Sequence, residues 1–455
     1  MTLNMLVEQL EQKSTRNLLR SSFYDGKRAI RQVGTVIPPQ YSKIGLALGW
    51  TAKGVDGLAR RCNLEQMVWA GGDLDSLGMN ELADGNFLFS EIAQGETDSL
   101  LHGVSYLITT AGDQSAGEPA SLIHSKDALN ATGEWNARTR ALDSVLSVTA
   151  RKDNDITGFV LYLNNLTISA EKTGNTWAVT RSVHTFGVPV DPMPYGPRSS
   201  RRMGRSRITR PAMGYQDAAL RALIRLEAHM DIYTIPKLML LGADESIFKN
   251  ADGSQKASWQ VALGRVFGIP DADPADSDNT RADVKQFAAE SPEPHLAQLN
   301  ALAKLMARET DLPDSDFALT DMANPTSAES YSASRENLIA EAEGATEDWS
   351  PAIRRTVSRA LAIQNGLTEV PKEWAGIEPK WRSPIYLSKA AAADAGAKQI
   401  GAVPWLAETE VGLELIGLDA LQIKRAMADK RRAAGRAVVA ALAAPVTPQD
   451  NANGA

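Results

Sequence analysis

The sequence predicts an α+β protein in which a β-rich block lies between helical segments. Residues 103–190 contain several short runs rich in β-branched and aromatic residues, and Gly, Asn and Asp separate many of these runs. On either side of this block, apolar residues recur at the three- and four-residue spacing of amphipathic helices. A length of 455 residues is enough for roughly three average domains.

The composition excludes several classes of protein. No apolar run approaches the ~18 residues that a membrane helix needs, and the acid-bearing start MTLNMLVEQLEQ is unlike a signal peptide. Cys62 is the only cysteine, so no internal disulfide can form, and we expect a half-buried structural thiol. A formal net charge of −7 argues against a general nucleic-acid coat, so any phosphate contact must come from a local basic patch.

The chain before the β-rich block is expected to be mainly helical. Residues 1–60 place leucines on one helical stripe, FYDGKRAI (23–30) interrupts them, and residues 51–64 predict a second short helix. Residues 65–100 are mixed, with MVWAGG as a short strand. Within the β-rich block, KDNDITG and EKTGNT are typical of hairpin turns, so we expect an antiparallel meander.

Connectors and well-marked helices alternate after the block. Residues 191–209 form a connector rich in Pro, Gly, Ser and Arg, and a helix is predicted from about Pro211 to Tyr233. KLMLLGADE then predicts a strand and a turn. A further helix is predicted after Ser291, the expected N-cap residue, and Pro313 ends it.

A long helix is predicted next. TSAE (326–329) matches a capping box, in which the side chains of the first and last residues cap each other's backbone amides, and the helix extends to about Ile363. Pro351 is expected to kink this helix, because proline lacks the N–H and its ring clashes with the preceding turn.

The C-terminal region combines loops with one basic helix. Trp374, Trp381 and Trp405 lie in loop-like surroundings. A helix rich in Lys and Arg is predicted from about Asp419, and APVTPQDNANGA is expected to be a disordered tail.

The sequence carries no recognisable pattern of catalytic or metal-binding residues. It contains no P-loop, dinucleotide fingerprint, G-x-S-x-G or H-E-x-x-H motif, and its five histidines are not at metal-ligand spacing. The acidic stretch 271–283 hints at a calcium loop, but its fifth, sixth and twelfth positions hold Ala275, Asp276 and Ala282 instead of the required residues. We therefore expect a solvated acidic loop there, no metal, no cofactor and no catalytic residue, as in a structural or assembly protein.

Six arginines are concentrated in PRSSRRMGRSRITRPAM (197–213), although the whole chain is acidic. Three interpretations are open: a solvated loop, a contact with an acidic partner or neighbouring subunit, and a contact with phosphate, which arginine fits bidentately without reading sequence. The arginines are Arg198, Arg201, Arg202, Arg205, Arg207 and Arg210.

One long stretch goes beyond general patterns. GRSRITRPAMGYQDAALRALIRLEAHMDIYTIPKLMLLGADE (204–245) resembles portal proteins of tailed bacteriophages, in the group common among phages of Gram-positive hosts. FYDGK, HTFGVPVDPMPYGPR, the segments 284–313 and 322–343, WRSPIYLSKAAAADAGAKQI and LIGLDALQIKRAM resemble other parts of that family in the same order. Asp191 and Tyr195 depart from the family's pattern.

The resemblance implies a portal fold with a mixed α/β wing, a two-helix stem, a small α/β clip, a long kinked helix and a helical crown. Residues 1–200 would form the wing, 201–233 the connector and first stem helix, 234–290 the clip, 291–312 the second stem helix, 313–325 the channel loop, 326–366 the long helix, 367–440 the C-terminal wing and crown, and 441–455 the tail. In the channel loop, Asp314, Ser315, Asp316, Thr320 and Asn324 would face the DNA.

The resemblance also implies a function and a set of partners. The chain would be a non-enzymatic subunit of a ring, usually twelve-fold, at one capsid vertex of the virion, assembled in the host cytoplasm. Double-stranded DNA would pass through the ring, which would contact the major capsid and scaffolding proteins, the terminase and later the head-to-tail connector. In this context the arginines are expected to contact neighbouring subunits or, less often, DNA. The alternative is a DNA-binding or metal-dependent DNA-processing protein that uses the 198–210 arginines.

Overall fold

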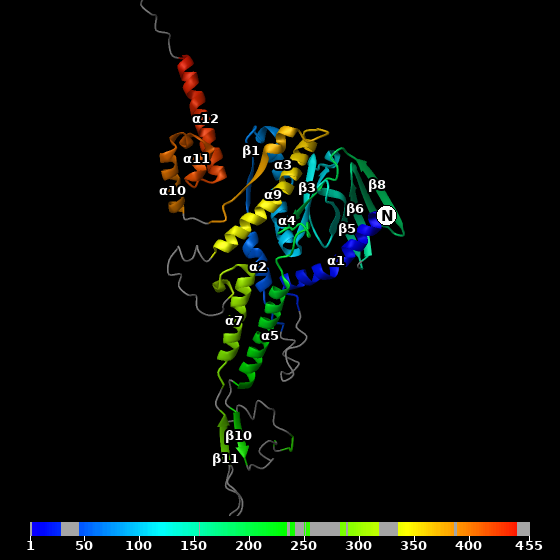
Figure 1. The fold of residues 1–455 in the computed structure, drawn as a ribbon, viewed down its shortest axis with the longest axis vertical. Coiled ribbons are helices and arrows are strands. Elements are labelled where there is room, and N and C mark those ends of the chain that lie inside the picture. Colours follow the sequence, from blue (N-terminus) through cyan, green and yellow to red (C-terminus); the bar gives the residue numbers. More distant parts are fainter. Residues whose placement is uncertain are drawn as a thin grey trace, which may run out of the picture. The chain divides into compact units, whose positions relative to one another are not determined.

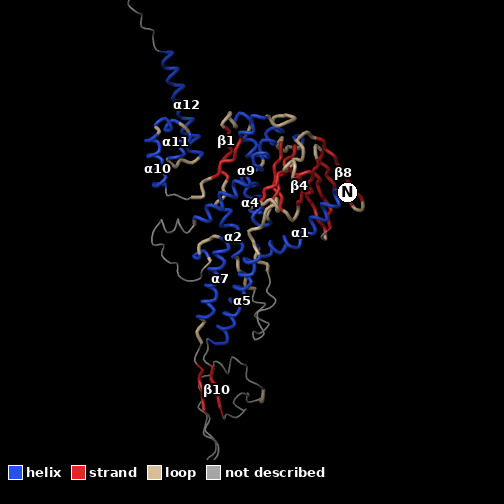
Figure 2. Tube along the Cα trace, in the orientation of Figure 1, coloured by secondary structure: helices blue, strands red, loops and turns tan. Residues whose placement is uncertain are grey.

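The computed structural model describes residues 2–28, 45–153, 155–233, 237–241, 250, 252–254, 283–287, 290–317, 335–385 and 389–443. The chain divides into two compact units, Met1–Lys380 and Trp381–Ala455. Figures 1 and 2 show their helices and strands, and each unit is described by itself.

Helices dominate the first hundred residues, as predicted. α1 ends where Gly26 adopts a left-handed φ of 66°, within the interrupting sequence FYDGKRAI. The strand predicted around MVWAGG exists but begins earlier. A long helix in the mixed region 65–100 was not specifically predicted. The elements are α1 (Thr2–Tyr24), α2 (Trp50–Ala59), β1 (Leu64–Trp69), η2 (Asp75–Leu77), α3 (Met79–Gly85) and α4 (Leu88–His102).

The β-rich block forms two sheets. Five strands follow one another in sequence order as an antiparallel meander, which confirms the predicted hairpins at KDNDITG and EKTGNT. The second sheet has the order β3-β2-β9. The strands are β2 (Val104–Ala111), β3 (Ser121–Asp127), β4 (Ala131–Asn136), β5 (Ala141–Lys152), β6 (Asp155–Leu163), β7 (Leu166–Thr173), β8 (Thr176–Val183) and β9 (Val190–Pro194).

Strand alternation gives the meander two buried faces at its β4–β6 end. On one face, Val145 and Tyr162 pack with β2 residues in one apolar cluster. On the other face, Leu146 and Leu161 pack with Leu6 and Leu10 of α1, in a second cluster. The far end differs, because every residue of β8 is exposed. α1 therefore covers only part of its face of the sheet.

The connector predicted at 191–209 is shorter than expected, because its first residues form β9. β9 pairs with β2 at one edge of the three-stranded sheet, and Val190, Asp191 and Met193 are buried. Proline lacks an N–H but is tolerated on an edge strand, which explains how Pro192 and Pro194 fit there. Their presence made the segment resemble a loop in sequence.

Two antiparallel helices follow, α5 (Arg210–Tyr233) and α7 (Glu293–Thr310). Both lie close to their predicted bounds, and they run side by side (Figure 1). The Ser291 hydroxyl accepts a hydrogen bond from the Glu293 N–H at 3.2 Å, as expected of a helix start. Between them, β10 (Lys237–Leu241) pairs antiparallel with β11 (Asp283–Phe287). The acidic stretch 271–283 lies outside the described residues except for Asp283, in β11.

The long predicted helix is present as α9 (Glu336–Gln364), and Pro351 lies inside it. The capping box at 326–329 lies outside the described residues, and the kink at Pro351 stays a prediction. α9 packs on β2 and β9. Trp349 is 0% exposed, and its indole Nε1–H donates to the Ser99 hydroxyl of α4 at 3.1 Å. The same hydroxyl donates to the Met193 carbonyl of β9 at 2.7 Å, so one serine links α4, α9 and β9.

The loop-like surroundings predicted for the three tryptophans are wrong, since each lies in a short helix or a strand, Trp405 in η7 (Pro404–Glu408). Trp374 is buried in the short helix η6 (Lys372–Gly376), and Trp381 ends the strand β12 (Ile377–Trp381), which pairs with β1. Trp374 is buried, and β12 pairs with a strand more than 300 residues away in the sequence. No local sequence pattern predicts either feature.

The second unit is helical where it is described. Its elements are α10 (Lys389–Ala402), η7 (Pro404–Glu408), α11 (Glu410–Leu415) and α12 (Ala420–Ala443). The basic helix α12 begins as predicted, because the Asp419 carboxylate accepts from the Gln422 N–H at 2.8 Å and the Gln422 side chain accepts from the Asp419 N–H at 3.1 Å. Among the helices that the structure describes in either unit, none combines the length and apolar character of a membrane crossing.

We predict that Trp349→Phe lowers the free energy of unfolding by about 2 kcal/mol, because it removes the hydrogen bond to Ser99 and leaves space in a close-packed core. Chemical denaturation measures this change. Trp177→Phe is the matched control: Trp177 is 43% exposed, so its replacement should change stability by less than about 0.5 kcal/mol. Equal effects of the two substitutions would contradict the prediction.

Candidate functional site

The structure separates the six clustered arginines into two kinds. Arg198, Arg201, Arg202, Arg205 and Arg210 are exposed, whereas Arg207 is buried. The exposed loop has a fixed backbone, since Arg198 and Arg201 exchange backbone hydrogen bonds of 3.0 and 2.9 Å. Sequence alone treats the six as one cluster, but only Arg207 is built into the interior of its own chain.

Arg207 joins four segments of the first unit through its guanidinium group. Nε donates to the Gly54 carbonyl of α2 at 2.7 Å, and Nη1 donates to the Tyr195 hydroxyl, just after β9, at 3.1 Å. Nη2 donates to the Thr310 carbonyl at the end of α7. Nη1 also lies 2.5 Å from a carboxylate oxygen of Glu341 in α9. We call Arg207 and these four partners the arginine joint.

The electrostatics of the arginine joint favour a charged guanidinium. Burial alone would lower the pKa of Arg207, but Tyr195 and Glu341 outweigh it and raise the pKa. Burial is also the largest reason why the pKa of Tyr195 is raised, and the Glu341 carboxylate, which accepts the Tyr195 hydroxyl, adds to it. At neutral pH Arg207 is therefore a buried cation and Tyr195 a neutral phenol.

The residues around Arg207 explain the local sequence GRSRITRP. Gly204 has a φ of 65°, and a Cβ there would lie 2.3 Å from the Gly103 carbonyl oxygen, so only glycine fits. The Ser206 hydroxyl donates to the Leu101 carbonyl at 2.6 Å. Thr209 caps α5 by accepting from the Ala212 N–H at 3.3 Å, and it donates to Glu309 of α7 at 2.5 Å. This stretch therefore positions the two antiparallel helices against α4.

A second polar contact ties β9 to α9. Asp191 is buried, and its carboxylate lies 2.6 Å from Nε of Arg355 and 2.8 Å from Nη2 of Arg359. The Thr356 hydroxyl also donates to it, at 3.3 Å. These contacts lie one to two turns after Pro351, so the part of α9 that follows the proline is held against the sheet.

The described part of the predicted channel loop, residues 313–317, forms the base of the loop and contacts α2 and Arg335. Asp314 and Ser315 are exposed in the short helix η5 (Asp314–Asp316). Asp316 instead lies 3.9 Å from the cationic groups of Lys53 and Arg335. Next to it, Phe317 is buried, edge-to-face on Trp50 of α2, with ring centroids 5.8 Å apart. Thr320 and Asn324 lie outside the described residues.

α2 can approach this base closely because it carries glycines on one side. A Cβ at Gly54 would lie 3.0 Å from the Thr310 side chain, and one at Gly57 would lie 3.0 Å from the Leu312 side chain. The same Gly54 offers its carbonyl to Arg207. α2 thus links the arginine joint to the base of the segment 313–325.

No group of three or more His, Cys, Asp or Glu that could hold a metal occurs among the residues that the structure describes. The histidines are less scattered than the sequence indicates, since the rings of His229 in α5 and His295 in α7 lie 5.2 Å apart. Cys62 is fully buried rather than half-buried, and burial raises the pKa of its thiol. That shift disfavours the thiolate and hence the reactive interpretation.

Comparison with known proteins assigns the chain. A family model described as "Phage portal protein, SPP1 Gp6-like" matches residues 4–409. The chain belongs to this family of phage portal proteins. It is similar to the portal protein of Mycobacterium phage L5, with 26% identity over 404 residues that cover 87% of this chain and 81% of the relative. The portal protein of Mycobacterium phage D29 is 25% identical over 403 residues, with the same coverage.

Among solved structures, the chain is similar to subunits of gene transfer agent particles. One is the neck of a native gene transfer agent particle computed with C12 symmetry, at 16% identity and a TM-score of 0.43, covering 81% of this portal chain and 89% of that chain. Another is the neck of an empty particle computed with C6 symmetry, at 15% identity and a TM-score of 0.45, covering 81% and 90%.

The structure places Arg207 among partners from its own chain. Its side chain is only 5% exposed and contacts Gly54, Tyr195, Thr310 and Glu341. A buried cation needs such compensation, because desolvation of a charge is costly. The other five arginines remain exposed, and their partners stay a prediction.

We predict that Arg207→Met lowers the free energy of unfolding by about 3 kcal/mol, because it leaves the Glu341 carboxylate and two backbone carbonyls without their partner. The double substitution Arg207→Met/Glu341→Leu should recover part of the loss, since it also removes the uncompensated charge. Chemical denaturation of the purified subunit measures both.

Arg205→Met is the matched control, two residues away and exposed. It makes the same change in charge and shape and should alter stability by less than about 0.5 kcal/mol. If Arg207→Met behaved like this control, the arginine joint would not hold the four segments together.

Proposed function

We propose that this portal protein is one subunit of a homo-oligomeric ring, usually twelve-fold, at one vertex of the capsid, and that double-stranded DNA enters and leaves through the ring. Membership of the portal family over residues 4–409 carries the proposal. The ring would be part of the virion, would assemble in the host cytoplasm, and would contact the major capsid and scaffolding proteins, the terminase and then the head-to-tail connector.

The charge of the chain supports a conduit rather than a clamp. A formal net charge of −7 opposes tight binding of DNA. If each subunit made several phosphate contacts, a ring would multiply them into avid, salt-dependent binding that stops DNA from sliding. Arg207, one of the six clustered arginines, binds Glu341 of its own chain.

Each proposed part of the ring corresponds to particular elements. The wing would comprise the two sheets with α1–α4, and the stem would comprise α5 and α7. The clip would lie within 234–290, which includes β10 and β11, and the channel loop within 313–325. α9 would connect the channel loop to the wing, with a kink at Pro351, and α10–α12 would form the crown.

We propose a structural role without catalytic activity or cofactor. Portal proteins are structural components, and the sequence has no ATPase motif, so a separate terminase would supply the energy of packaging. The alternative, a DNA-processing protein that uses the 198–210 arginines, is not favoured, because the family is one of portal proteins and Arg207 is buried.

Electron microscopy of the purified full-length chain in negative stain tests the ring. We expect closed rings with a central hole and high rotational symmetry. A uniform monomer at high concentration, also in the presence of capsid and scaffolding proteins, would overturn the proposal.

The channel assignment makes a prediction that separates two neighbouring aspartates. Asp314→Lys should leave the free energy of unfolding unchanged within about 0.5 kcal/mol, because Asp314 is exposed. It should nevertheless lower the phage titre about tenfold or more, because a ring of added lysines would hold the DNA by avidity.

Asp316→Lys serves as the comparison. It places a third cation beside Lys53 and Arg335, so it should destabilise the subunit itself. Denaturation curves and titres of the two variants measure both effects. If the Asp314→Lys variant gave a wild-type titre, the assignment of this segment to the channel would be wrong.

A further inference from the structure

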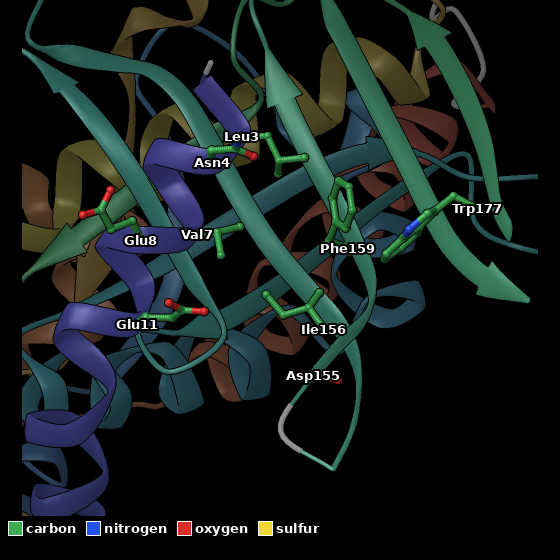
Figure 3. A pocket seen from close by; sticks show the side chains of 9 residues that line it. All are labelled: Leu3, Asn4, Val7, Glu8, Glu11, Asp155, Ile156, Phe159 and Trp177. Atoms are coloured by element: carbon green, nitrogen blue, oxygen red, sulfur yellow. The ribbon is translucent and has the colours of Figure 1, made fainter. Parts of the chain in front are cut away.

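The exposed surface of α1 is divided into two regions of opposite charge. Its first half carries Glu8 and Glu11, which rim a groove of about 430 Å³ between α1 and β6 together with Asp155. Figure 3 shows Leu3 and Val7 of α1 facing Ile156 and Phe159 of β6 across this groove, with Trp177 of β8 beyond them. We call Glu8, Glu11 and Asp155, with the groove that they rim, the acidic pole.

Apolar surface continues from the acidic pole onto β8. Trp177 lies against Phe159, with ring centroids 5.4 Å apart, and is 43% exposed. The register places Val179 opposite Ala170, which is opposite Phe159, so these side chains share the face that α1 covers further along. Val179 and Val183 are 54% and 82% exposed. β8 pairs only with β7 within its sheet, so this apolar face ends at an open edge.

The second half of α1 carries the opposite charge. Arg16 is exposed, and Arg20 donates to the His102 carbonyl at 3.1 Å. The loop 198–205 meets the same end of α4, because a Cβ on Gly204 would lie 2.3 Å from the carbonyl oxygen of Gly103, the residue after His102. Burial, together with the charges of Arg16 and Arg201, lowers the pKa of Arg20 to about 10. We call Arg16, Arg20, Arg198, Arg201 and Arg202 the basic pole. Leu18 and Leu19, 56% and 37% exposed, lie beside it on α1.

The outer ends of the two poles lie far apart on one chain. Glu8 and Arg20 are about 18 Å apart along α1, at ~1.5 Å per residue. The screening length at physiological salt is about 8 Å, so their attraction across that distance is largely screened. Each pole combines exposed charge with exposed apolar side chains, which is the composition of a contact surface rather than of a solvated face.

We propose that the acidic pole of one copy docks against the basic pole of the next copy, so that neighbouring wings are joined head to tail. The occupant of each pole is thus a second copy of this chain. Two different, complementary patches on one subunit can form a heterologous contact, which repeats around a closed ring. The inference rests on the proposed ring and names the surfaces that close it.

Charge exchange between two variants tests the pairing. Variant A is Glu8→Lys/Glu11→Lys, and variant B is Arg198→Glu/Arg201→Glu; all four residues are exposed. In either variant alone, every contact sets like charges face to face, so assembly should weaken more than about tenfold. In an equimolar mixture, an alternating ring restores opposite charges at every contact. Native mass spectrometry should therefore find rings that contain A and B in equal number, and few rings of either variant alone.

Glu65→Lys/Glu373→Lys is the matched control, because it changes the same charge at two exposed residues away from both poles. It should assemble like the wild type. Thermal unfolding checks that each variant folds, and Asp155→Lys with Arg202→Glu provides a second exchange pair should the first fold poorly.

The outcomes separate this inference from the proposed function. Absence of rings from the wild type would reject the ring itself. Wild-type rings together with normal assembly of A or B alone would overturn the pairing of the poles while leaving the ring intact. Failure of the mixture to restore rings would also overturn it. If B assembled normally but bound double-stranded DNA more weakly, the basic pole would belong to DNA instead.

Discussion

Arg207 carries a full positive charge into a site where only 5% of its side chain remains exposed, and partners on four segments compensate that charge. Since a buried cation is tolerated only when its partners are well placed, the relative positions of α2, α7, α9 and the end of β9 are constrained together. Displacement of any one of them removes a partner from the guanidinium. The apolar clusters give the first unit most of its burial, but they do not select one arrangement of these helices as strictly, because apolar contact is non-directional.

The sequence departs from the portal family's pattern at Asp191 and Tyr195, and both residues bind α9. Asp191 accepts from Arg355, Arg359 and Thr356, and Tyr195 bonds to Glu341 and Arg207. These two side chains therefore fasten β9 and the residue after it to the long helix α9 by polar contacts.

Sequence-based prediction succeeds where the signal lies within the element or next to it, and it fails where the signal comes from residues far away in the chain. The bounds of α5 and α7 and the start of α12 could be predicted, because apolar spacing, prolines and capping side chains all lie within the helix or next to it. The sequence of β9 predicts a connector instead of a strand, because its prolines are compatible with a strand only at a sheet edge, and the position of a strand in its sheet is a tertiary feature. Arg207 could not be told apart from its five neighbours, because the carbonyls that it binds are 153 and 103 residues away in sequence. The resemblance identified the family correctly but assigned roles by stretch rather than by residue.

Gly103 and Gly204 lie back to back where the end of α4 meets the arginine-rich segment. A Cβ on Gly204 would come within 2.3 Å of the Gly103 carbonyl oxygen, and one on Gly103 within 3.0 Å of the Arg205 backbone. Both also have positive φ angles, of 65° for Gly204 and 103° for Gly103. A side chain on Gly204 would displace the backbone of Gly103, and one on Gly103 would displace the backbone of Arg205 and Ser206. Over evolutionary time, the exposed arginines between 198 and 210 are free to drift in identity as long as a partner surface drifts with them. The glycine pair has no such latitude, and we expect it to persist in descendants of this phage long after the charges around it have been exchanged.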